Sequence, residues 1–280
     1  MLPIIYGLAS ALSWGAGDFT GGLAARKVGA YRSVFYAEVI GIIFLFIVIS
    51  FSSESLPSAR ARFFAIIAGV VGTIGLMLLY HAMATGVMSI AAPVSALLAA
   101  TLPVVIGIFT EGLPEFLTML GFAFALFAVW MVSQGKDGVK DIFSHLSDLK
   151  LPLIAGIGFG LYYILMDQAT QDGGAFWHML FARVGGISLI LIYLIITRSS
   201  WKIDPTALPI ISVNGILDLG GNFFFILASQ AGRLDVSAVL SSLFPGATVV
   251  LAWIFLKERL TRNQWIGILS ALIAIILMTI

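Results

Sequence analysis

The sequence predicts an all-α integral membrane protein with ten transmembrane helices, arranged as two inverted repeats of five helices each. Composition gives the first reason, because 60% of the 280 residues are apolar and only 10% are charged, whereas a soluble domain has about 25% charged residues. Internal repetition gives the second, since the segment at residues 2–8 resembles the segment at 151–157. Aligning the two copies also pairs Glu38 with Arg183, an acid with a base.

Apolar windows bounded by charge, glycine or proline place the ten helices, each close to the ~20 residues that cross a hydrocarbon core about 30 Å thick. They cover residues 3–25, 31–51, 61–84, 88–110, 114–133, 151–170, 175–197, 207–230, 234–256 and 262–280. The connections are short, so consecutive helices should be antiparallel neighbours. We expect Pro93 and Pro103 to interrupt the fourth helix and Pro245 the ninth, because proline removes a backbone hydrogen bond.

The predicted domains are a first repeat over residues 1–133 and a second over 151–280, joined by a linker at 134–150. The linker either forms a short helix on the membrane interface or stays solvated. Five helices per repeat is an odd number, so the second repeat should enter the bilayer in the opposite sense. Eleven loop lysines and arginines fall in odd-numbered connections and three in even-numbered ones, which favours both termini outside.

Charge and cysteine content exclude several kinds of function. Fifteen basic against fourteen acidic residues give a net charge of +1, without the basic face of a nucleic-acid-binding protein. Cysteine is absent, so disulfides, thiolate catalysis and Cys-ligated metals are excluded. We expect no cofactor and no metal. The expected partners are the lipid bilayer and a small-molecule substrate, with the protein acting as a monomer or a homodimer.

Ionisable side chains inside the predicted spans are the first candidates for function, because each costs about 2.5 to 3.5 kcal/mol to place in a bilayer. They are Asp18, Glu38, Asp167, Arg183 and Asp218. Four carboxylates and one arginine cannot all be charged in a dry site, which predicts bound protons or a cationic ligand.

Glu38 and Arg183 occupy equivalent positions in the second and seventh helices, and both should approach the central axis. One interpretation is a buried ion pair that locks the two halves together. In the other, Arg183 binds a substrate carboxylate or phosphate, and Glu38 binds a proton or an ammonium group.

The eighth helix carries Asn214, Asp218 and Asn222 at spacings of four residues, which places them on one helical face. A central carboxylate between two amides favours a water-filled cavity over hydrogen bonding that only holds helices together.

Trp14 with Asp18, and Tyr163 with Asp167, form aromatic–acid pairs four residues apart. An aromatic face beside an acid can hold an organic cation. Packing with a helix-end hydrogen bond is the alternative, and it is favoured for Asp167.

Three motifs resemble the paired EamA domains of the drug/metabolite transporter superfamily: residues 7–15, 245–260 and 264–267. The resemblance implies two inverted five-helix EamA repeats, a central cavity lined mainly by helices one to four and six to nine, and export or exchange of small metabolites across the cell membrane. The first repeat departs from the pattern, because Leu98 stands where the second has Pro245. Related carriers also have cytosolic termini, whereas the loop charges favour termini outside the cell. Both orientations therefore stay open.

Together these observations predict a multi-pass secondary transporter, not an enzyme, that exports or exchanges a small metabolite by alternating access. The predicted substrate is an amino acid, a related zwitterion or an organic cation. The predicted substrate-binding residues are Arg183, Asp218, Asn214, Asn222, Glu38, Trp14, Asp18 and Tyr163, of which Glu38, Asp218 and Asp18 are the proton-coupling candidates. A membrane-embedded lipid-modifying enzyme and a passive channel are the alternatives. A lipid-modifying enzyme would need clustered acids or a His–acid pair. Unequal charges at symmetric positions argue against a passive channel.

Overall fold

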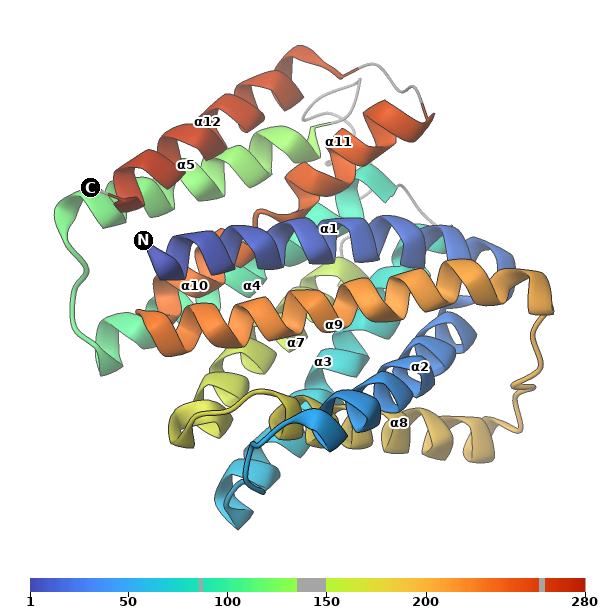
Figure 1. The fold of residues 1–280 in the computed structure, drawn as a ribbon. Coiled ribbons are helices and arrows are strands. Elements are labelled where there is room, and N and C mark those ends of the chain that lie inside the picture. The colour runs from blue at the N-terminus through green and yellow to red at the C-terminus, as the bar shows by residue number, and fades with distance from the viewer. Residues whose placement is uncertain (86–87, 135–149, 257–259, 280) are drawn as a thin grey trace.

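The computed structural model describes residues 1–85, 88–134, 150–256 and 260–279, which fold into a helical bundle without strands in those ranges (Figure 1). The α-helices in those ranges are α1 (Leu2–Val28), α2 (Ala30–Phe51), α3 (Ala59–Thr85), α4 (Met88–Thr110), α5 (Phe116–Ser133), α7 (Lys150–Ala169), α8 (Phe176–Thr197), α9 (Leu208–Ala231), α10 (Leu234–Ser241), α11 (Phe244–Leu256) and α12 (Arg262–Thr279). The predicted helix at the membrane interface lies outside the described residues.

Every predicted apolar window is helical, with ends that differ by at most a few residues. Seven segments in the described ranges are long and apolar enough to cross a membrane, and α4 and α5 contain shorter apolar stretches. The seven correspond to α2, α3, α7, α8, α9, α10 with α11, and α12. Helix α1 is not among them, so the count of ten transmembrane helices stays a prediction.

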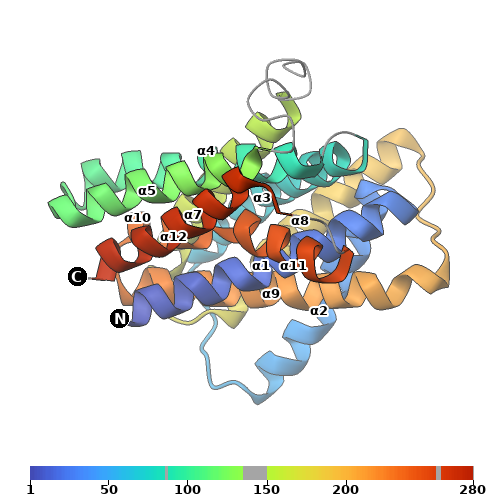
Figure 2. The same ribbon diagram turned by 90° about the horizontal axis from the view of Figure 1, so that it is seen from above.

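The helices pair in a reciprocal pattern across the two halves of the chain. Helix α1 packs along α9 and helix α7 packs along α3, while α2 meets α8 and α5 meets α12. Figures 1 and 2 show α5 and α12 side by side, with the two ends of the chain at the same end of the bundle. Each half is therefore packed extensively against the other.

Glycines allow the closest of these approaches. A Cβ added at Gly69 of α3 would overlap the backbone carbonyl of Ala182 in α8, and one added at Gly221 of α9 would overlap the Trp14 indole. Small residues at such positions let helix backbones approach when no aqueous driving force holds them together.

The prolines act differently in the two halves. Helix α10 ends at Ser241 and α11 begins at Phe244, which confirms the predicted interruption before Pro245, because proline has no N–H to bond the carbonyl four residues back and its ring clashes with that carbonyl. The predicted interruption of α4 is wrong, since that helix runs unbroken through Pro93 and Pro103.

Residues 95–102 of α4 lie directly on two bare glycines of α7, Gly156 and Gly160. Helices α4 and α7 therefore approach closely along the stretch between the two prolines.

Loops at both ends reach across to the other half. Between α2 and α3, the Glu54 carboxylate accepts hydrogen bonds from the backbone N–H groups of Ala175 and Phe176, both at 2.9 Å. These groups open α8, where a carboxylate also meets the positive end of the helix dipole. Between α8 and α9, the Ser200 carbonyl accepts from Tyr31 at 3.1 Å and Arg32 at 2.9 Å.

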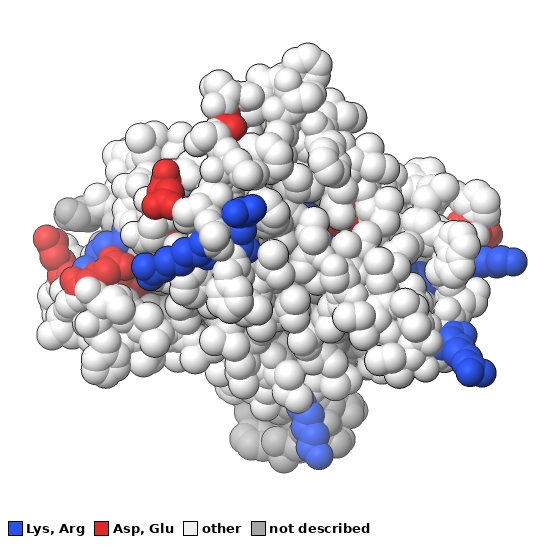
Figure 3. Space-filling model, turned by 90° about the horizontal axis from the view of Figure 1, so that it is seen from below, with Lys and Arg blue, Asp and Glu red and all other residues white. Residues whose placement is uncertain are grey.

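Most of the visible surface is uncharged. Figure 3 shows lysine, arginine, aspartate and glutamate in small separate groups, mostly toward the left and right sides of one face, with large uncharged areas between the groups. Large exposed apolar side chains such as Phe46, Ile195 and Ile276 suit contact with lipid chains. The arrangement is that of a multi-pass membrane protein.

Candidate functional site

A cavity of about 80 Å³ lies among α1, α2, α3, α7, α8, α9 and α11. A water molecule needs roughly 10 to 15 Å³ on this measure, so the cavity has room for several waters or one small ligand. Seven of the eight predicted substrate-binding residues line it: Trp14, Asp18, Glu38, Tyr163, Arg183, Asp218 and Asn222. Asn214 does not.

Arg183 is the centre of the polar wall. Its Nη1 lies 3.1 Å from the Glu38 carboxylate of α2, and its Nη2 donates to the Asp218 carboxylate of α9. The guanidinium is 7% exposed and Glu38 is 6% exposed. One buried cation is thus held by two acids from helices that belong to different halves.

Two residues that the sequence did not single out extend this network. The Thr73 hydroxyl of α3 donates to Glu38 Oε1 at 3.2 Å, and the Tyr162 hydroxyl of α7 donates to the Asn222 amide oxygen. The Asn222 amide nitrogen in turn donates to Asp218 Oδ2 at 3.1 Å. Tyr162 is a polar residue next to Tyr163, a predicted site residue, and this position could have indicated it. The only feature of the sequence that pointed to Thr73 was the group of glycines around it.

Glycine makes room for the ion pairs. A Cβ added at Gly186 of α8 would overlap the Thr73 hydroxyl and lie 3.2 Å from Glu38 Oε1. One added at Gly41 of α2 would lie 3.3 Å from Arg183 Nε. The guanidinium, Thr73 and Glu38 therefore lie against glycine backbone, which leaves them room.

Asp18 lines the cavity without a partner of its own. The residue is 7% exposed, and its carboxylate makes no hydrogen bond or ion pair within the described part of the chain. Asp218 is close enough to repel it. Beside it, the Trp14 indole stacks on the Tyr163 ring with centroids 5.5 Å apart.

Asn214 lies outside the cavity. Its amide nitrogen donates to the Gly17 carbonyl at 2.8 Å and to the Tyr80 hydroxyl at 2.9 Å. It therefore joins α9 to α1 and α3 one turn away from Asp218, as a contact between helices.

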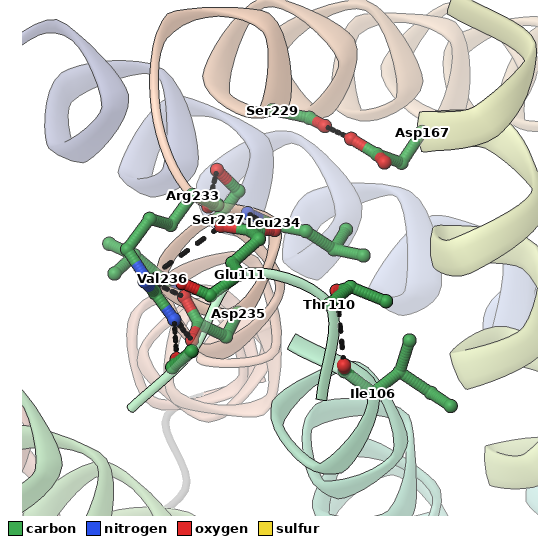
Figure 4. Close-up of polar contacts among 11 residues, drawn as sticks. Ile106, Thr110, Glu111, Asp167, Ser229, Arg233, Leu234, Asp235, Val236 and Ser237 are labelled. Atoms are coloured by element: carbon green, nitrogen blue, oxygen red, sulfur yellow. Dashed lines mark hydrogen bonds and ion pairs between the residues drawn. The ribbon is translucent and has the colours of Figure 1, made fainter. Parts of the chain in front are cut away.

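Asp167 also lies away from the cavity. Its carboxylate accepts hydrogen bonds from Ser229 of α9 and from Gln171, the latter at 3.3 Å (Figure 4). The favoured interpretation, a hydrogen bond near the helix end, agrees with this position.

A second arginine cluster lies beyond Asp167, where α9 turns into α10 (Figure 4). Arg233 bonds Asp235 at 2.8 Å, lies 3.7 Å from the Glu111 carboxylate and donates to the Gly112 carbonyl at 2.8 Å. The hydrogen bond to Asp235 raises the pKa of Arg233. Burial raises the pKa of Glu111, against the hydrogen bond it accepts from the Leu234 N–H.

Comparison with known proteins identifies the family. The model of the EamA-like transporter family matches residues 1–134 and 149–280. The chain belongs to this family. EamA-like proteins are transporters, so the cavity belongs to a membrane transporter of the drug/metabolite type.

Two curated relatives and one solved structure extend the comparison. An uncharacterized protein of Methanocaldococcus jannaschii is 34% identical over 130 residues, which are 46% of this chain and 94% of that protein. An uncharacterized protein of Haemophilus influenzae is 31% identical over 123 residues, 42% of this chain and 41% of that one. A crystal structure at 14% identity has a TM-score of 0.73 and covers 97% of this chain and 96% of its own, which shows a shared fold.

Proposed function

We propose that this EamA-like protein is a secondary active transporter of the cell membrane that exports or exchanges a small organic metabolite through the central cavity. The observation that carries the proposal is Arg183, buried at the cavity between Glu38 and Asp218. Burying such charges is costly, and replacing a buried ion pair by apolar residues is often neutral or stabilising. Stability alone therefore does not account for it, whereas a polar site in the membrane is what transport needs.

The second part of the proposal is that the two halves, residues 1–133 and 151–280, are inverted repeats that rock against each other around the cavity. Three observations support it. The family model matches the chain in two segments, and the archaeal relative matches along 94% of a length close to one half. Helix packing is also reciprocal, with α1 on α9 and α7 on α3.

The third part is proton coupling. Three carboxylates, Asp18, Glu38 and Asp218, line the cavity with one guanidinium, so full ionisation would leave a net charge of −2. A low-dielectric site does not hold that charge uncompensated, and protons or a cation must enter it. Exchange of protons for substrate at these acids couples the two movements.

Alternating access follows from where the acids are attached. Glu38 is on α2 and Asp218 is on α9, while Arg183 is on α8. A ligand or proton that neutralises one acid frees the guanidinium from that helix, and the helix can then move. Only a ligand with different affinity for the two states can shift their balance.

The test is uphill flux in proteoliposomes with a panel of labelled amino acids and organic amines under an imposed pH gradient. We expect one member to accumulate against its gradient. Asp218→Asn should abolish accumulation, because Arg183 then keeps only Glu38. Asp167→Asn, an equal change outside the cavity, should not. Accumulation by Asp218→Asn at the wild-type rate would refute the site, and downhill flux alone would indicate a channel.

A further inference from the structure

The structure assigns a charge to the substrate of this cavity. We propose that the cavity binds a primary ammonium group attached to an apolar or aromatic body, with the ammonium on Asp18 and the body against Trp14 and Tyr163. The inference rests on the proposed function and narrows its substrate class from zwitterions and cations to organic cations.

Asp18 carries the first step of the argument. This acid is only 7% exposed and lines the cavity. It has no ion pair or hydrogen bond to any residue that the structure describes. A buried carboxylate without a partner is expensive. A bound cation would supply the missing counter-charge.

The state of Arg183 carries the second step. The zwitterion hypothesis requires its guanidinium to bind a substrate carboxylate, but both terminal nitrogens already face acids, Glu38 and Asp218. An incoming carboxylate would have to displace one of these acids and leave it buried without a cation. Among the residues that the structure describes, no other lysine, arginine or histidine lines the cavity. Within that part of the chain, a substrate anion therefore has no free basic partner.

The aromatic wall carries the third step. Trp14 lies one turn from Asp18 on α1 and stacks on Tyr163, which in turn stacks on Phe225 at 4.5 Å. Aromatic faces attract cations, most strongly when water is excluded. Gly221 of α9 leaves room for the indole, because any side chain there would overlap it. Charge, aromatic surface and burial thus coincide at one end of the site.

The experiment compares four probes that share a phenyl ring and differ in charge: phenethylammonium, phenylalanine, phenylacetate and 2-phenylethanol. Binding to the full-length purified protein is measured by calorimetry and by the shift in melting temperature, which rises for a ligand that binds the native state. We expect phenethylammonium to bind most tightly. Asp18→Asn should weaken it at least about tenfold, which is 1.4 kcal/mol, and Asp167→Asn should leave it unchanged.

Further variants keep the test decisive if Asp18→Asn does not yield folded protein. Asp18→Glu keeps the charge and should retain binding, whereas Trp14→Leu keeps the charge and removes the aromatic face, so it should weaken phenethylammonium severalfold. Failure of phenethylammonium to bind the wild type, or equal binding by Asp18→Asn, would overturn the inference. Tighter binding of phenylalanine that depends on Arg183 would also do so.

The same probes separate this inference from the transport proposal. Uphill accumulation of phenylalanine that is lost in Asp218→Asn would leave the transporter intact and overturn the cation site. Binding of phenethylammonium that depends on Asp18, without uphill movement of any probe, would support the cation site and count against coupled transport.

Discussion

Two arginines in this protein each lie between two carboxylates. The differences between them distinguish a ligand-binding site from a contact that only stabilises the fold. Arg183 is 7% exposed, and its partners in the described part of the chain are two side chains, Glu38 and Asp218. Arg233 is 30% exposed and also donates to two backbone carbonyls, those of Glu111 at 3.3 Å and Gly112 at 2.8 Å. Backbone partners hold Arg233 in one arrangement, whereas the partners of Arg183 can be neutralised by protons or ligand.

Location supports the same distinction. Arg183 borders a cavity, so there is space for a ligand to replace one of its partners. Arg233 joins the α9–α10 turn to the end of α4, where Asp235 is fully buried. The first arginine should therefore matter most to transport and the second most to stability.

The largest effect is expected from Arg183→Ala. This change leaves Glu38 and Asp218 without the cation that they share, so we expect uphill transport to fall by about 100-fold or more. Arg183→Lys should recover part of it, since a point charge replaces a planar fork. Initial rates in proteoliposomes measure both, and transport by Arg183→Ala within a factor of two or so of the wild type would contradict the comparison.

Arg233→Ala should mainly lower stability. It leaves the buried Asp235 carboxylate with a hydrogen bond from the Val236 N–H, 2.8 Å away, but without a cation. An uncompensated buried charge of this kind costs about 2 kcal/mol or more. The melting temperature in detergent should fall by several degrees while substrate affinity is kept. A second change, Asp235→Asn, should restore part of the loss. A stable Arg233→Ala protein that has lost transport would reverse the assigned roles.

A smaller effect is expected from a single methyl group beside the site. Gly186→Ala would push against Thr73 and Glu38, and we expect substrate affinity to fall by about tenfold, or 1.4 kcal/mol. Gly246→Ala is the matched control, because nothing lies within 4 Å of its added Cβ. Calorimetric titration distinguishes the two. Equal affinities in both variants would show that the Thr73–Glu38 contact does not shape the site.

The smallest effect is expected at Glu111, which is partly exposed. Because burial raises its pKa in the folded state, the unfolded chain loses its proton first as pH rises. Stability from this group is therefore present below its ordinary pKa and declines as pH rises through the raised one. Glu111→Gln should flatten the plot of melting temperature against pH in that window. The corresponding change in the free energy of unfolding should be less than about 0.5 kcal/mol. A steeper profile in the variant would mean that Arg233 outweighs burial.

The helices were predictable because apolar length is a strong signal in a membrane protein. The charged residues of the cavity were predictable for a related reason, since an ion inside a bilayer needs an explanation. Uncharged polar residues such as Thr73 and Tyr162 carry no such cost and are common in membrane helices, so the sequence did not distinguish them.

Asn214 shows a limit of helical spacing. A residue four positions on is rotated by about 40° from the first, and one eight positions on by about 80°. Asp218 and Asn222 can therefore face the cavity while Asn214 turns toward Gly17 and Tyr80. The prolines show another limit, because the sequence gives all three the same interpretation, whereas α4 continues through Pro93 and Pro103 and α10 ends before Pro245.

The most direct test of the account is access to the cavity from each side of the membrane. The chain has no cysteine, so Met179→Cys, which lines the cavity, gives one thiol without background. Water is needed to form the reactive thiolate. We expect a membrane-impermeant maleimide to label it from either side of sealed vesicles, with substrate slowing both reactions, and Leu45→Cys in the packed core to stay unlabelled. Labelling of Met179→Cys from one side only under every condition, or from neither, would contradict alternating access through this cavity.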